Sequence, residues 1–288
     1  MDDDRVLLAL GGGAARGLAH IGVLRGLEED GIEVIGIAGT SMGSIVGALA
    51  ASGVNANEIE SVFRSVGWTT LGRIMLGSMV GEAFHDLLLE TLGKGSIENL
   101  RIPFAAVCCD IDTGEEVVLR EGSIADAVRA SSAIPGFLTP FRIGARTLVD
   151  GVVVEPVPVN AARDLGQAPV LPVNVLRPPE PGQPTTFVHS PPRAHGLRSA
   201  VLARVERWMT RRADGNGEFD LPGRREVVMR SFLIMQYHLA ASMCEPVPMI
   251  EPDVGRFGWF DFAKVRGIVD EGYHAYRRWR ADTQRSAP

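Results

Sequence analysis

The stretch IEVIGIAGTSMGSIVGALAAS, residues 32–52, joins two segments of different character. Its first part, IEVIGIAG, is a short, continuous apolar run, which predicts a strand that is buried on both faces. Its second part, SMGSIVGALAAS, predicts a helix. The stretch therefore predicts a strand that turns directly into a helix, with one serine at the turn.

That serine, Ser41, is the centre of a G-x-S-x-G motif completed by Gly39, Thr40, Met42 and Gly43. A tight turn between a strand and a helix can hold a serine in a strained position, and small flanking residues allow the backbone to turn. The helix N-terminus and the next backbone N–H then face any charge that develops at the serine. Ser41 is a candidate nucleophile, with the other four residues as its elbow.

The preceding residues repeat the same alternation. RVLLAL, residues 5–10, predicts a buried strand, and ARGLAHIGVLRGLEED, residues 15–30, has apolar residues at helical spacing. Strands and helices that alternate with short connections indicate a parallel sheet with right-handed crossovers. The fold class is therefore predicted to be α/β, with a mostly parallel central sheet.

Further elements are predicted along the chain. Strands are expected in IPFAAVCCDI, in GEEVVLR, in a run that ends at Asp150 and in APVLPVNVL, and a helix is expected from near Ser123 to before Pro135. Residues 177–196 are rich in proline, glycine, threonine and serine, which is typical of a loop or linker. Helices follow at about 197–212, 224–243 and 262–280. The predicted organisation is a catalytic α/β region (1–176), a linker (177–196) and a helical C-terminal region (197–288) that packs on it.

Composition excludes several classes of function. The 288 residues carry a formal net charge of −6, which gives no reason to expect nucleic-acid binding. Three cysteines without metal-ligand spacing predict neither a disulfide framework nor a metal site. The acidic start lacks the positive region of a secretory signal, and no apolar stretch approaches the roughly 20 residues that span a bilayer. We expect a cytoplasmic protein, with peripheral contact at the inner membrane surface left open.

A glycine-rich loop, GGGAARG (residues 11–17), follows the first predicted strand. Loops at the carboxyl ends of parallel strands share one edge of the sheet, so this loop is expected beside Ser41. The backbone N–H groups of Gly11, Gly12 and Gly13 could hold an oxyanion, and Arg16 would add a positive charge or anchor the loop. The competing interpretation is a dinucleotide-binding loop, but its glycine spacing fails and no acidic residue ends the second strand.

A nucleophilic serine needs a base, and none of the six histidines has a convincing setting in the sequence. Asp150 ends the apolar run TLVD and is followed by glycine, which places a carboxylate at a turn next to the sheet. An ordinary turn aspartate is the alternative interpretation. Asp150 is thus the preferred candidate for the base.

Several segments resemble the patatin-like phospholipases, especially the compact bacterial branch related to neuropathy target esterase. They are LGGGAARGLAHIGVL, GTSMG, RASSAIPGFLTPF, DGVVVEPVPV and the C-terminal IEPDVGRFGWFDFAKVRGIVDEGY. The resemblance implies a three-layer α/β/α sandwich and a Ser-Asp dyad without histidine. Residue by residue, it implies Ser41 as nucleophile, Asp150 as base and an oxyanion site at Gly11, Gly12 and Gly13 near Arg16.

Two positions depart from the family pattern. Ala14 replaces a glycine of the loop, which matters if a positive φ is required there, and Val152 replaces a small residue after Asp150-Gly151. The implied activity is hydrolysis of acyl esters, with phospholipids, lysophospholipids or other fatty acyl esters as substrates and with no cofactor or metal. The departures bear on rate and substrate size.

Two alternative functions and the placement of one segment remain open at this point. A conventional α/β-hydrolase would use a Ser-Asp-His triad with His238 or His274, and a non-catalytic regulator would keep the fold and bind lipid or a partner. The basic segment GLRSAVLARVERWMTRR, residues 196–212, could form an amphipathic helix that lies in a membrane interface or packs on the sheet region. The sequence leaves the oligomeric state and the choice of lipid undetermined.

Overall fold

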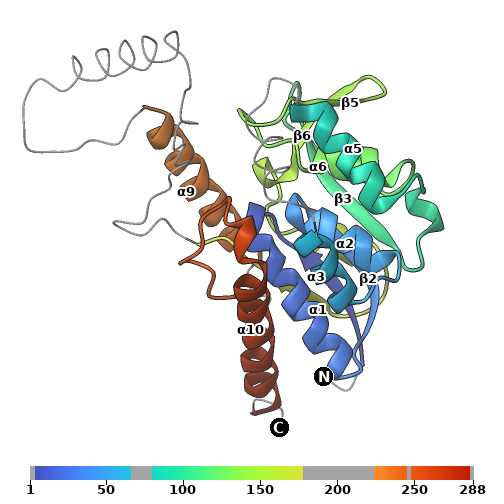
Figure 1. The fold of residues 1–288 in the computed structure, drawn as a ribbon, viewed down its shortest axis with the longest axis vertical. Coiled ribbons are helices and arrows are strands. Elements are labelled where there is room, and N and C mark those ends of the chain that lie inside the picture. Colours follow the sequence, from blue (N-terminus) through green and yellow to red (C-terminus); the bar gives the residue numbers. More distant parts are fainter. Residues whose placement is uncertain (1–3, 66–79, 178–223, 245–247, 286–288) are drawn as a thin grey trace, which may run out of the picture.

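The structure is a computed structural model that describes residues 4–65, 80–177, 224–244 and 248–285 (Figure 1). A central sheet lies at its middle, with helices on both sides. The predicted helix at about 197–212 and the predicted linker lie outside the described residues. The division of the chain at residues 176 and 196 therefore stays a prediction.

Seven strands form the sheet in the order β5-β6-β3-β2-β1-β7, and β4 pairs with β3. Their bounds are β1 Arg5–Leu10, β2 Glu33–Thr40, β3 Phe104–Asp110, β4 Glu116–Leu119, β5 Phe141–Ile143, β6 Arg146–Asp150 and β7 Val170–Val173. The strands β1, β2, β3 and β7 are mutually parallel, as predicted. In contrast, β6 runs antiparallel to β3, so Asp150 approaches the site from the opposite direction.

The main helices are α1 Ala19–Glu29, α2 Met42–Ala51, α3 Ala56–Ser65, α5 Val80–Leu92, α6 Ile124–Ser131, α7 Val159–Arg163, α9 Arg224–Cys244 and α10 Val265–Arg285. Short 3-10 helices occur at η1 Ala14–Leu18, η2 Ile97–Asn99, η3 Gly151–Val153 and η4 Phe262–Lys264. The helix predicted from Ser123 begins there, because the Ser123 side chain accepts a hydrogen bond from the Asp126 amide. None of the described helices combines the length and apolar character needed to cross a bilayer.

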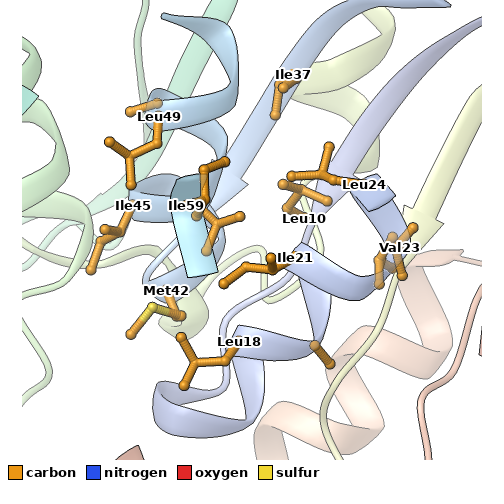
Figure 2. Close-up of a cluster of buried hydrophobic side chains, with 14 of the residues drawn as sticks. Leu10, Leu18, Ile21, Val23, Leu24, Ile37, Met42, Ile45, Leu49 and Ile59 are labelled. Carbon is orange, nitrogen blue, oxygen red and sulfur yellow. The ribbon is translucent and has the colours of Figure 1, made fainter. Parts of the chain in front are cut away.

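Alternate residues of the central strands enter different cores. On β1, Leu8 and Leu10 join the larger cluster with α1, α2, α3 and α10, whereas Ala9 joins a second cluster with α7 and α9. Figure 2 shows part of the larger cluster, in which Leu10 and Ile37 of the sheet meet side chains of α1 and α2. Both faces of the sheet are therefore covered by helices, which is the predicted three-layer α/β/α arrangement.

The C-terminal helix α10 lies along α1 (Figure 1). The two backbones approach closely, because a Cβ atom added at Gly272 would lie 1.8 Å from the carbonyl oxygen of Ala19. Tyr276 is fully buried in the same contact, and its hydroxyl donates to Asp30 at 2.8 Å. The contact therefore holds α1 along its length, from Ala19 near the glycine-rich loop to Asp30 at the other end.

Candidate active site

Ser41 occupies the turn between β2 and α2 with φ 55° and ψ −124°. A positive φ is costly for a residue with a side chain, and strain of this kind is concentrated at functional sites. The flanking glycines are required by close backbone approach. A Cβ at Gly43 would lie 2.0 Å from the carbonyl oxygen of Leu10, and one at Gly39 would lie 2.5 Å from that of Gly43. The motif thus forms the expected strained elbow.

The hydroxyl of Ser41 donates a hydrogen bond to Oδ2 of Asp150 at 2.6 Å. Strand register explains how residues 109 positions apart meet. Thr40 is level with Val107 of β3, and Asp150 is level with Cys108, the next residue of β3. Ser41 and Asp150 therefore flank the same point of β3 from its two sides.

Asp150 is fully buried, and Ser41 is 4% exposed. Burial raises the pKa of Asp150 to about 7, while hydrogen bonds from the Ser41 hydroxyl and the Val152 amide act in the opposite direction. A carboxylate with an ordinary pKa is a weak base, whereas one that titrates near neutrality can accept a proton effectively at physiological pH. The environment therefore supplies the basicity that an exposed aspartate lacks.

The backbone amide of Ser41 donates to the hydroxyl of Ser131 at 3.1 Å, and that hydroxyl donates to the carbonyl oxygen of Val107 at 2.7 Å. Ser131 thus ties the strained elbow to β3. Sequence reasoning did not single out this residue. It lies in the segment RASSAIPGFLTPF, which predicts the end of a helix and resembles the family, but neither pattern indicates a contact with Ser41.

Replacing Ser131 with alanine is expected to leave two buried backbone groups unpaired, at Ser41 and Val107. We expect a loss of about 1–3 kcal/mol in the free energy of unfolding and a fall in kcat of about tenfold. Denaturant unfolding and ester turnover measure the two effects.

Ser132 provides the matched control, since its buried hydroxyl has no hydrogen-bond partner in the described part of the chain. Ser132→Ala should therefore cost little stability. Equal effects of the two substitutions would contradict the role given to Ser131.

In the glycine-rich loop, the amides of Ala15 and Arg16 donate to the carbonyl oxygens of Trp259 and Gly13, and two glycine amides are engaged as well. Gly11 N donates to Val173 O at 3.1 Å, and Gly12 N donates to Pro156 O at 2.9 Å. The amides of Gly13 and Ala14 have no acceptor within the described parts of the chain. Ala14 has φ 48°, so the positive φ that favours glycine is adopted here by alanine, at a cost of roughly 1–2 kcal/mol.

The side chain of Arg16 reaches the segment before α10. Its Nε donates to Phe257 O at 2.7 Å, and one Nη donates to Gly255 O at 3.2 Å. Of the two roles considered for Arg16, the contacts match the anchoring one. Thr40 and Met42 are also structural in their contacts, since the Thr40 hydroxyl donates to Glu155 O and Met42 packs in the larger core cluster.

Val152, the second departure from the family pattern, lies against the loop. A Cβ at Gly12 would be 2.2 Å from Cγ1 of Val152 and 3.1 Å from Cβ of Ser41. Gly12→Ala is therefore expected to cost about 1–3 kcal/mol of stability by overpacking and to lower kcat.

The double substitution Gly12→Ala with Val152→Ala should recover at least about 1 kcal/mol relative to the sum of the single changes, because it removes the clash. Thermal unfolding of the four proteins measures this coupling. Strict additivity would show that Val152 does not shape the loop.

The histidines proposed for a triad are far less enclosed than Ser41. His238 on α9 and His274 on α10 both have exposed side chains. His85 pairs with Asp126 at 2.8 Å, and His189 and His195 lie outside the described residues. Burial raises the pKa of the Cys108 thiol well above its ordinary value, which suits a packing residue. The described residues contain no cluster of side chains able to hold a metal ion.

Comparison with known proteins gives consistent matches. The family model described as patatin-like phospholipase matches residues 8–163. An uncharacterised NTE family protein of Mycobacterium tuberculosis is 39% identical over 161 residues, covering 54% of this chain and 44% of that protein. A second one from the same species is 31% identical over 281 residues, covering 94% of this chain and 45% of that protein.

A lysophospholipase, NTE1 of Pyricularia oryzae, is 28% identical over 288 residues, covering 92% of this chain and 18% of that protein. The crystal structure of VipD from Legionella pneumophila aligns with a TM-score of 0.50 at 15% identity, covering 95% of this chain and 66% of that one, and supports the fold. The chain spans less than half the length of these curated relatives. With more than half of its residues matched by the family model, the chain belongs to the patatin-like phospholipase family.

Proposed function

We propose that this protein is a serine lipid acyl hydrolase that uses Ser41 and Asp150 as a catalytic dyad. The observation that carries the proposal is the 2.6 Å hydrogen bond from a strained serine to a fully buried carboxylate. Membership of the patatin-like phospholipase family supports lipid hydrolysis in general. No cofactor or metal takes part in the proposed chemistry.

In the proposed mechanism, Asp150 accepts the proton of the Ser41 hydroxyl as its oxygen attacks the ester carbonyl carbon. The carbonyl oxygen becomes an oxyanion, which the free amides of Gly13 and Ala14 stabilise. The proton then passes from Asp150 to the departing alcohol oxygen, leaving an acyl group on Ser41. Water, deprotonated by Asp150, attacks the acyl-enzyme, and the fatty acid leaves while Ser41 regains its proton.

Two features of the glycine-rich loop indicate which of its amides would bind the oxyanion. The Gly11 and Gly12 amides are bound to carbonyl groups of β7 and of the segment after β6, so they shape the loop. A Cβ added at Gly12 would lie 3.1 Å from Cβ of Ser41, so the loop passes beside the nucleophile immediately before Gly13. We therefore propose Gly13 and Ala14 as donors, with Gly11, Gly12 and Arg16 as supports.

The proposed substrates are lysophospholipids first, followed by diacyl phospholipids and simpler carboxylic esters. The relative from Pyricularia oryzae that covers most of this chain is named a lysophospholipase, which motivates this order. Contact with a bilayer surface through residues 197–212 also remains a proposal, because that segment lies outside the described residues.

Fatty acid release from mixed micelles, followed by mass spectrometry, tests the proposal. Wild-type protein should release fatty acid from lysophosphatidylcholine or phosphatidylcholine, and Ser41→Ala should not. Ser52→Ala, at the other end of α2, is the matched control and should behave as wild type.

The remaining alternatives are outcomes of the same assay. Loss of turnover in a folded His238→Ala or His274→Ala variant would favour a histidine triad. A wild-type protein that neither releases fatty acid nor reacts with a fluorophosphonate would favour a non-catalytic lipid-binding protein.

A further inference from the structure

His20 is a buried histidine that the proposed mechanism does not use. It is the second residue of α1, and its side chain is completely enclosed. Its Nε2 lies 2.7 Å from the carbonyl oxygen of Gly11. Because a carbonyl oxygen can only accept, Nε2 is the donor in this hydrogen bond.

With this contact, both polar groups of one peptide unit are hydrogen-bonded. The carbonyl of the Gly11–Gly12 peptide accepts from His20, and the N–H of the same unit donates to Pro156 O at 2.9 Å. A peptide unit is planar, so holding both of its polar groups fixes its orientation. The next unit carries the free N–H of Gly13, and Ala14 follows.

We propose that His20 is a positioning residue that holds the glycine-rich loop in the conformation needed to bind the oxyanion. The inference rests on the proposed hydrolase function, since it concerns the same site. His20 acts through the Gly11 carbonyl and does not touch the substrate. Removing its N–H leaves a buried carbonyl unpaired and frees the glycine loop, whose residues have little steric preference, to reorient.

The environment of the imidazole suits this role. Burial lowers the pKa of His20 to about 4, against the opposing effect of the Gly11 hydrogen bond, so the ring is neutral at physiological pH. With Nε2 protonated, the neutral ring leaves Nδ1 as an acceptor, and Nδ1 has no hydrogen-bond partner among the residues that the structure describes. A neutral donor orients the loop through its hydrogen bond alone and adds no positive charge beside the loop amides.

Two substitutions separate the hydrogen bond from simple packing. His20→Leu replaces the imidazole with an apolar side chain that fills part of its space and removes the donor. In His20→Gln, the amide nitrogen can reach the position of Nε2 and donate in its place. The exposed His274, changed to Leu and to Gln, gives matched controls on α10. Steady-state kinetics with a soluble ester, measured well below the melting temperature of each protein, give kcat, KM and the pH dependence.

We expect His20→Leu to lower kcat by about 10- to 100-fold with KM changed by less than about threefold, as for a weakened oxyanion site. The pH–rate profile should show an inflection near pH 7 in both the wild type and His20→Leu, since it is set by Asp150, whose pKa is raised to about 7. His20→Gln should recover most of the loss, and the His274 variants should match wild type. Long-range ¹H–¹⁵N NMR of the wild type should show a neutral ring protonated at Nε2.

Several results would overturn the inference. These are an unchanged kcat in His20→Leu, an equal loss in His20→Gln, a fall in activity that simply follows the melting temperature, or a ring protonated at Nδ1. A wild-type protein without Ser41-dependent turnover would instead overturn the proposed function, and this inference with it. The two failures are therefore distinguishable.

Discussion

Ser41→Ala is expected to lower ester hydrolysis by at least about 10³-fold, because the substitution removes the atom that forms the acyl-enzyme. Loss of a nucleophile leaves only the residual catalysis provided by the oxyanion site and substrate binding. The variant should still fold, since alanine fits the space of the serine. Turnover of a chromogenic ester and far-UV circular dichroism measure activity and folding.

The kinetic form of this loss is informative. The fall should appear in kcat, and substrate should still bind. The inhibition constant of a non-hydrolysable ether lipid, measured on the wild type, should therefore agree with the dissociation constant of that lipid for Ser41→Ala. Ser52→Ala should retain full activity. If folded Ser41→Ala kept more than a few per cent of the wild-type rate, another residue would be the nucleophile.

Asp150→Asn is expected to lower kcat by about 10²- to 10⁴-fold, which is the usual contribution of a general base. In the wild type, Asp150 must be deprotonated to accept the Ser41 proton, and burial raises its pKa to about 7. The rate should therefore fall about tenfold per pH unit below this value and level off above it. A pH–rate profile with a soluble ester measures the inflection.

Glu155 is the matched control for that profile. Burial also raises its pKa to about 7, with a smaller contribution from the nearby carboxylate of Glu116. Glu155→Gln should keep the inflection near pH 7, since its carboxylate is bound to the Asn160 amide rather than to Ser41. Loss of the inflection in Glu155→Gln would show that the titrating group is Glu155 and would contradict its assignment to Asp150.

Asp150→Asn should also change the stability of the protein in a pH-dependent way. The pKa of Asp150 is higher in the folded protein than in the unfolded chain, so the folded state favours the protonated form. Its contribution to stability is complete below about pH 4, declines as the pH rises to about 7 and is then constant. Asp150→Asn, which stays neutral, should therefore raise the melting temperature at pH 8 by several degrees more than at pH 4.

Local sequence patterns were sufficient for much of the fold. Continuous apolar runs predicted β1, β2, β3 and β7, because strands buried on both faces carry apolar residues at every position. The direction of β6 was not predictable, since a short apolar run can pair with its neighbour in either direction. The helices α3 and α5 were not predicted. In α3 the signal was present and was missed, because its apolar residues, among them the buried Ala56 and Ile59, lie on one face of the helix.

The site divides in the same way. The elbow at Ser41 is a local motif, and Asp150 could be chosen from its place at the end of an apolar run. Ser131 contacts the backbone amide of Ser41, which is 90 residues away in the chain. His20 contacts the backbone carbonyl of Gly11 in the glycine-rich loop. Both residues lie in segments that resemble the family, but a hydrogen bond to a backbone group leaves no residue pattern at the other end, so only the three-dimensional structure could reveal their contacts.

Mapping the adduct formed with a fluorophosphonate tests the central claim most directly. After treatment of the wild type, tryptic digestion and mass spectrometry should find one phosphonylated residue, Ser41. The labelling rate should fall about tenfold per pH unit below pH 7 and should be strongly reduced in Asp150→Asn. An adduct on another residue, or labelling of Ser41 that does not depend on pH or on Asp150, would contradict the Ser41–Asp150 dyad.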